Sequence, residues 1–162
     1  MKLLKIELLL GLMAFGFLLS SCTWDSADNP VPSSTTTIWT GPKISFSKNS
    51  GADPSLAENQ DRISDRVWIT RGNEGGQIYN AVSEASAEKT TSPAGTLWAV
   101  GTTADLQTLE FDNFRIAVEK PQNVVGKDLV LFLVGDNIAI DIKFTAWANN
   151  NMGGFAYERS SN

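Results

Sequence analysis

The fold is decided by the stretch Asp128-Leu-Val-Leu-Phe-Leu-Val134, Gly135-Asp-Asn137, Ile138-Ala-Ile-Asp-Ile-Lys-Phe-Thr-Ala146. Its first seven residues form an almost continuous apolar run, as is typical of a strand buried on both faces. The last nine alternate between apolar and polar side chains, which predicts a strand with one solvent-facing side. The Gly-Asp-Asn turn between them joins the two strands as neighbours. This stretch therefore predicts the centre of an antiparallel sheet.

The same pattern extends in both directions from this pair. An Asn/Gly-rich turn follows at 149–154, and residues 154–159 predict a third strand of the meander. Upstream, short β-branched and aromatic runs predict further strands at 44–48, 67–70, 77–82 and 96–100. The second and third of these flank the glycine-rich turn 72–76 and predict a hairpin. Residues 104–107 predict a single helical turn with Thr103 as its cap.

After residue 22, no segment carries an apolar helical stripe ten residues long. Many short strands separated by turn signals indicate an all-β chain. We therefore expect an antiparallel, jelly-roll-like β-sandwich domain over residues 38–162.

The N-terminus predicts export. Lys2 and Lys5 precede an apolar run from Leu8 to Leu19, and this order is typical of a secretory signal peptide. The run is too short for a membrane-spanning helix, which needs about 20 apolar residues. The small residues before Cys22 resemble the lipobox of bacterial lipoproteins. That resemblance implies cleavage after residue 21 and acylation of Cys22, which then becomes the first residue of the mature chain.

Residues 22–37 are polar and rich in proline, as expected of a tether between the lipid and the domain. Thr23 stands where an aspartate, on the usual sorting rule, would retain a lipoprotein in the inner membrane. Asp25 and Asp28 are either a weak surface-export signal or an ordinary solvated linker. We expect an outer-membrane lipoprotein of a Gram-negative bacterium, with its periplasmic or surface orientation left open.

Composition excludes several function classes. Loss of residues 1–21 removes two lysines and one glutamate, so the net charge falls from −5 to −6. An acidic chain is poorly suited to binding nucleic acid through charge. The chain contains one cysteine and no histidine, which excludes Ser-His-Asp nucleophile systems and histidine-ligated metal sites. Once Cys22 carries lipid, the domain has no thiol chemistry.

Two longer stretches resemble a module of exported bacterial proteins. They run from Ala52-Asp53-Pro54 through Val67-Trp68-Ile69-Thr70-Arg71-Gly72, and from Val125-Gly126-Lys127 through Gly153-Gly154-Phe155-Ala156-Tyr157-Glu158-Arg159-Ser160. The module occurs alone on lipoproteins or repeated in larger secreted chains. The resemblance spans most of residues 39–160. It implies a self-contained extracellular domain and adds no catalytic residue.

The segment 53–65 is dense in oxygen ligands of the kind that calcium accepts. The candidate ligands for a structural Ca²⁺ are Asp53, Glu58, Asn59, Asp61 and Asp65. The alternative is an acidic loop whose carboxylates pair with nearby arginines. Arg62, Arg66 and Arg71 form either such a salt-bridge network or a site for an acidic sugar or peptide carboxylate.

Trp147 follows the polar side of its strand, and Tyr157 lies in the next strand. Together they predict an exposed aromatic platform on which a sugar ring stacks, with Asp141 and Arg159 as hydrogen-bonding neighbours. The alternative is that Trp147 closes the end of the core.

The predicted function is a non-catalytic, lipid-anchored interaction module that binds a glycan or an envelope protein. The alternatives are a structural partner in envelope assembly and a small glycoside hydrolase. The hydrolase would use a pair drawn from Glu110, Asp112, Asp141 and Glu158. We do not expect an enzyme, because nothing in the sequence fixes the separation of two such carboxylates.

Overall fold

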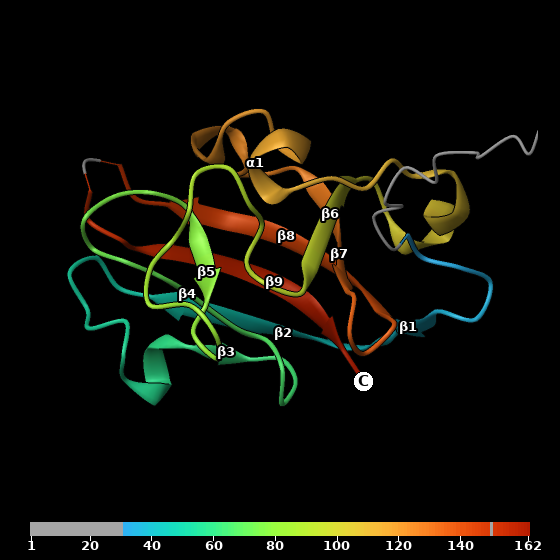
Figure 1. Cartoon of the computed structure of the whole chain (residues 1–162), viewed down its shortest axis with the longest axis horizontal. Helices are drawn as coiled ribbons and strands as arrows, with labels where there is room; N and C mark the ends of the chain where they lie inside the picture. Colours follow the sequence, from blue (N-terminus) through green and yellow to red (C-terminus); the bar gives the residue numbers. More distant parts are fainter. Residues whose placement is uncertain (1–30, 150) are drawn as a thin grey trace, which may run out of the picture.

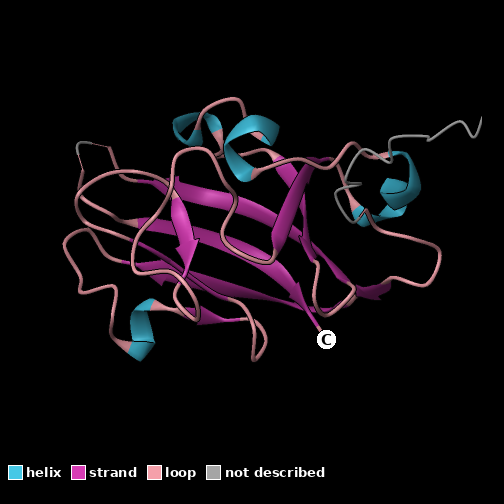
Figure 2. Ribbon diagram, viewed as in Figure 1, coloured by secondary structure: helices cyan, strands magenta, loops and turns pink. Residues whose placement is uncertain are grey.

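The computed structural model describes residues 31–149 and 151–162. The predicted signal peptide, Cys22 and the first part of the predicted tether lie outside the described residues. The strands form two sheets that pack face to face (Figures 1 and 2). In the part of the chain that is described, no helix has the length and apolar character needed to cross a membrane.

The large sheet has the order β2-β9-β8-β7-β6, and β1 pairs with β8 outside this path. Its strands are β1 (Thr37–Trp39), β2 (Gly41–Lys48), β6 (Thr96–Val100), β7 (Asp128–Leu133), β8 (Ile138–Trp147) and β9 (Phe155–Ser161). The small sheet contains β3 (Asp61–Arg62), β4 (Trp68–Arg71) and β5 (Ile78–Asn80). The helices are the short 3₁₀ turns η1 (Ala57–Asn59), η2 (Thr103–Thr108) and η3 (Pro121–Asn123), and α1 (Phe114–Ala117).

The all-β sandwich expected from the sequence is confirmed. Strands β7, β8 and β9 form the antiparallel meander, and β4 pairs with β5 across the glycine-rich turn. All pairings between the named strands are antiparallel except that of β1 with β8. The run 128–133 is buried apart from its first residue, as a continuous apolar strand requires.

The core lies between the two sheets. Ile69 and Ile78 of the small sheet pack in one cluster with Trp98, Phe144 and other apolar residues of the large sheet. Helix α1 adds Phe114, whose ring meets Trp98 edge-on with centroids 4.9 Å apart. Burying each such aliphatic or aromatic side chain is worth about 1.5–3 kcal/mol. This cluster accounts for the packing of the two sheets.

The opposite face of the large sheet is only partly covered. The segment around η2 packs Leu106, Leu109 and Phe111 over Val130 and Ala139. Across β8 and β9 the outer face instead carries polar or charged side chains, including Lys143 and Glu158. The outer face of the sandwich is therefore apolar under η2 and hydrophilic beyond it.

A β-bulge interrupts the alternation of β8. Phe144 pairs with Tyr157, but Ala146 pairs with Ala156, so one extra residue, Thr145, lies on β8. Thr145 and Ala146 are both exposed. The extra residue shifts every later side chain to the other face, and Trp147 therefore packs against the core.

The end of the predicted tether is held by the domain. The Thr37 amide donates to the Asn137 carbonyl at 3.0 Å, and Gln107 donates to the Ser33 carbonyl at 3.2 Å. The predicted helical turn is present as η2, but Thr103 does not cap it. Thr102 occupies the cap position without a side-chain bond, and the Thr103 hydroxyl donates to Asp141 at 2.8 Å.

Candidate functional site

The four residues expected to form one sugar-binding face do not share a surface, and this expectation is corrected. Asp141 lies on the outer face, where it accepts hydrogen bonds from the Thr103 amide and hydroxyl at 2.7 and 2.8 Å. Tyr157 and Arg159 are buried on the inner face, 1% and 5% exposed. Trp147 lies at the end of the core, because the bulge at Thr145 turns it inward.

Trp147 closes one end of the aromatic core. Its ring lies 6.1 Å from that of Phe114, 5.9 Å from Phe144 and 6.4 Å from Phe155. The Arg71 guanidinium lies over the ring, 3.9 Å from its centroid. With a cation on its face and core rings beside it, Trp147 does not form an open stacking platform. Its indole Nε1 is buried and has no partner among the described residues.

Tyr157 and Arg159 form a buried network with Asp61. The Asp61 carboxylate accepts from the Tyr157 hydroxyl at 2.7 Å and from Arg159 Nε and Nη2 at 2.6 and 2.9 Å. Burial, followed by the charge of Asp61, raises the pKa of Tyr157 well above 10. Because Asp61 belongs to β3 and the other two residues to β9, the network ties the small sheet to the large one.

Among the other candidate calcium ligands, Asp53 and Asn59 lie in hydrogen-bond contact. Asp53 accepts from the amide and hydroxyl of Ser55, both at 2.8 Å, and the Asn59 amide donates to the Asp53 carbonyl. Glu58 and Asp65 are exposed. Among residues 31–149 and 151–162, no three acidic or cysteine side chains cluster as a metal site would require. The calcium site stays a prediction, and Asp61 is already engaged by Arg159.

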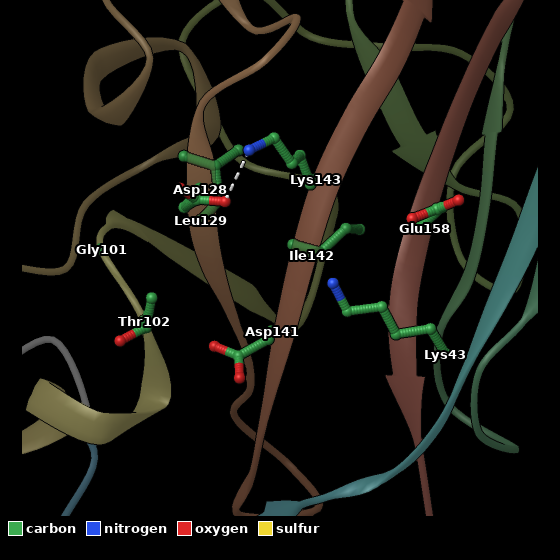
Figure 3. Close-up of a pocket in the computed structure, with 9 residues that line it drawn as sticks. All are labelled: Lys43, Gly101, Thr102, Asp128, Leu129, Asp141, Ile142, Lys143 and Glu158. Atoms are coloured by element: carbon green, nitrogen blue, oxygen red, sulfur yellow. Dashed lines mark hydrogen bonds and ion pairs between the residues drawn. The ribbon is translucent and has the colours of Figure 1, made fainter.

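A shallow hollow of about 140 Å³ lies on the outer face (Figure 3). Lys143 donates to Asp128 at 2.9 Å across it, and Lys43 extends from the β2 side toward Asp141. Its lining contains two lysines and three carboxylates, Asp128, Asp141 and Glu158. These charges largely compensate one another, so the hollow has little preference for a charged ligand.

A second hollow, of about 220 Å³, lies between the loops at the Trp147 end of the sandwich. We call it the basic recess. Its lining includes Arg71, Lys89, Arg115, Gln122, Trp147 and Asn149, and no described acidic residue. Three elements bring the cations together: the end of β4, the loop after β5, and helix α1. The recess therefore concentrates positive charge on an otherwise acidic protein.

Arg71 is the buried member of this set, with 3% of its surface exposed. Its Nε donates to the Gly76 carbonyl at 3.2 Å, and its Nη1 donates to the Ala148 and Gly154 carbonyls at 2.9 Å. No described carboxylate pairs with it. Burial lowers the pKa of Arg71 to about 10. The guanidinium thus remains a cation at neutral pH without a counter-charge in the described structure.

Lys48 is a second buried cation beneath the same loop. It is 2% exposed and donates to Asn73 Oδ1 at 2.8 Å and to the Gly153 carbonyl at 3.3 Å. Burial, followed by repulsion from Arg71, lowers the pKa of Lys48. Together, Lys48 and Arg71 hold the carbonyls of the segment that follows Trp147.

The other two arginines singled out in the sequence have different partners. Arg66 lies 3.6 Å from Asp136 in a partly exposed ion pair. The Arg62 guanidinium stacks on Trp68, 4.1 Å from the ring centroid. Arg71 is therefore the member of the trio that the structure places in a hollow without an acidic partner.

The basic recess continues into a wider groove of about 550 Å³. The two hollows share Gly75, Gly76 and Lys89, and Tyr79 lies in the wall of the groove. β8 spans ten residues from Ile138, beside β1, to Trp147, so the recess lies about 30 Å from the tether end at roughly 3.3 Å per residue. Figure 1 shows β1 and the β8–β9 loop at opposite ends of the molecule.

Comparison of the chain with protein-family models, with curated proteins and with solved structures finds no match in any of the three. The resemblance to an exported module therefore stays an expectation.

Proposed function

We propose that this chain is a lipid-anchored, non-catalytic binding module that acts outside the cytoplasm of a Gram-negative bacterium. Cys22 carries the lipid, and the tether positions the domain at the outer membrane. The ligand is a glycan, which occupies the basic recess and the groove that continues from it.

The observation that carries this proposal is the position of the two hollows. They lie at the end of the sandwich opposite β1, where the tether enters the domain. In a protein anchored through residues before β1, this far end is the part of the sandwich farthest from the side of attachment. Many of the side chains that line the recess are cations or amides, and such groups suit a hydroxyl-rich ligand through hydrogen bonds.

The hydrolase alternative gains no support from the outer hollow. Of its carboxylates, Asp141 is held by Thr103, and Asp128 is paired with Lys143. A hydrolase pair in this hollow would have to join Asp141 with Glu158, and Asp141 already accepts two hydrogen bonds from Thr103.

The test is a glycan array probed with the lipidated protein in neutral detergent. Ala87 lies in the wall of the groove, next to Gly76, so Ala87→Trp should block the groove and abolish binding. Ser45→Trp, at an exposed position on β2 that lines neither hollow, is the matched control and should bind normally. Binding that Ala87→Trp leaves intact would remove this site. A protein that co-purifies stoichiometrically, together with no glycan binding, would favour the envelope-assembly role instead.

A further inference from the structure

We infer that the glycan residue held in the basic recess carries a carboxylate, as a uronic acid does. This inference rests on the proposed function and specifies the ligand of the same site.

The positive charge of the recess is uncompensated among its described lining residues. Arg71, Lys89 and Arg115 line it, and no described acidic side chain does. Lys89 and Arg115 form no ion pair or hydrogen bond with any described residue. The adjoining groove has one acidic lining residue among the described residues, Glu74. Three cations facing one hollow repel one another, and a bound anion would relieve that repulsion.

Two buried cations, Arg71 and Lys48, hold the loop that borders the recess. Both are almost fully buried, and the atoms that accept their hydrogen bonds are neutral carbonyl and amide oxygens. The attraction between Lys48 and Asp53 is smaller than the combined effect of burial and of repulsion from Arg71. Burying a cation without a counter-ion costs stability. An anion seated beside Arg71 would supply the missing charge, so binding and folding should be linked.

The hydrogen-bond donors of the recess suit a sugar that carries a carboxylate. Arginine presents a planar fork that matches the two oxygens of a carboxylate. The remaining polar lining, Gln122 and Asn149, offers amides to hydroxyl groups. Arginine clusters also recognise acidic peptides, but such peptides are usually anchored in addition by a strand edge or an apolar pocket. Here the largest apolar ring of the recess, Trp147, is covered by Arg71, and the amides of Gln122 and Asn149 suit the several hydroxyl groups of an acidic sugar.

The inference is tested with three uronic-acid polymers, polygalacturonate, alginate and hyaluronan, measured by calorimetry against the lipidated protein in neutral detergent. The matched ligand is fully methyl-esterified polygalacturonate, which keeps the sugar and removes the charge. We expect at least one acidic polymer to bind, its affinity to fall as salt rises, and the methyl ester to bind at least tenfold more weakly.

Two double variants distinguish binding in the basic recess from binding to cations on another face of the protein. Lys89→Gln with Arg115→Gln should lower affinity by about tenfold or more, since hydrogen bonds to charged groups are among the stronger ones. Lys43→Gln with Lys143→Gln removes two cations from the outer face and should leave affinity unchanged. Circular dichroism and the melting temperature verify that each variant is folded.

Three results would overturn the inference. The first is equal binding of the acidic polymer and its methyl ester. The second is an affinity that falls as much in the outer-face variant as in the recess variant. The third is the absence of binding to any of the three polymers. If neutral glycans bind and Ala87→Trp blocks them, the proposed function stands while this inference fails. If no glycan of either kind binds, both fail.

Discussion

The buried Asp61–Arg159 pair allows a quantitative prediction about what joins the two sheets. We expect Asp61→Asn to lower the free energy of unfolding by about 3–5 kcal/mol, because it leaves the Arg159 cation buried without a partner. The side chains of Arg159 and Asp61 are 5% and 9% exposed, and their shortest contact is 2.6 Å. Domains of this size are stabilised by about 5–15 kcal/mol. The variant should therefore lose a large share of its stability.

Urea unfolding, followed by tryptophan fluorescence, measures this loss. With a slope of about 2 kcal/mol per molar urea, the midpoint should fall by about 2 M. Asp128→Asn is the matched control, because it makes the same chemical change in the Lys143–Asp128 pair. That pair is also short, at 2.9 Å, but its side chains are 44% and 62% exposed. It should cost less than about 1 kcal/mol. Equal losses in the two variants would refute the reasoning.

Two further predictions concern alkaline pH and the β8–β9 loop. The pKa of the Tyr157 hydroxyl is raised above 10 in the folded state, so the unfolded chain loses the hydroxyl proton at a lower pH than the folded chain does. The free energy of unfolding of the wild type should therefore fall by about 1.4 kcal/mol between pH 9 and 11, relative to that of Tyr157→Phe. A difference in free energy between the two proteins that urea titrations find constant over this range would contradict the prediction. Gly153 has φ +68°, and a Cβ there would meet the Gly72 carbonyl at 2.6 Å. Gly153→Ala should therefore lower the melting temperature more than Gly51→Ala, whose φ is +79° but whose Cβ meets nothing within 4 Å. Equal decreases in melting temperature for the two variants would contradict this prediction, because they would mean that the loop rearranges to accommodate the methyl group at residue 153.

Much of the sheet could be predicted because its strands carry a local signal. The apolar run of β7 and the alternation of β8 each follow from side-chain periodicity. β3 carries no such signal, since it is only Asp61–Arg62 and lies within a polar segment. It is held in place by its pairing with β4 and by the long-range hydrogen bond that Arg159 donates to Asp61.

The candidate site could be predicted from the sequence less well than the strands could. Strict alternation along β8 placed Trp147 on the solvent side, and the single extra residue at Thr145 reversed that placement. The basic recess joins Arg71, Lys89 and Arg115, which come from separate elements far apart in the chain. No spacing rule connects them. The one available signal was the grouping of Arg62, Arg66 and Arg71, which included the residue that lines the recess.

The position proposed for the recess, at the end of the sandwich far from the membrane anchor, depends on a lipid at Cys22. Mass spectrometry of the N-terminal peptide, from protein extracted out of membranes, measures the chemical state of Cys22 directly. We predict a mature chain that begins at residue 22 and carries fatty acyl groups. A chain that retains its first 21 residues, or a Cys22 with an unmodified thiol, would contradict the account.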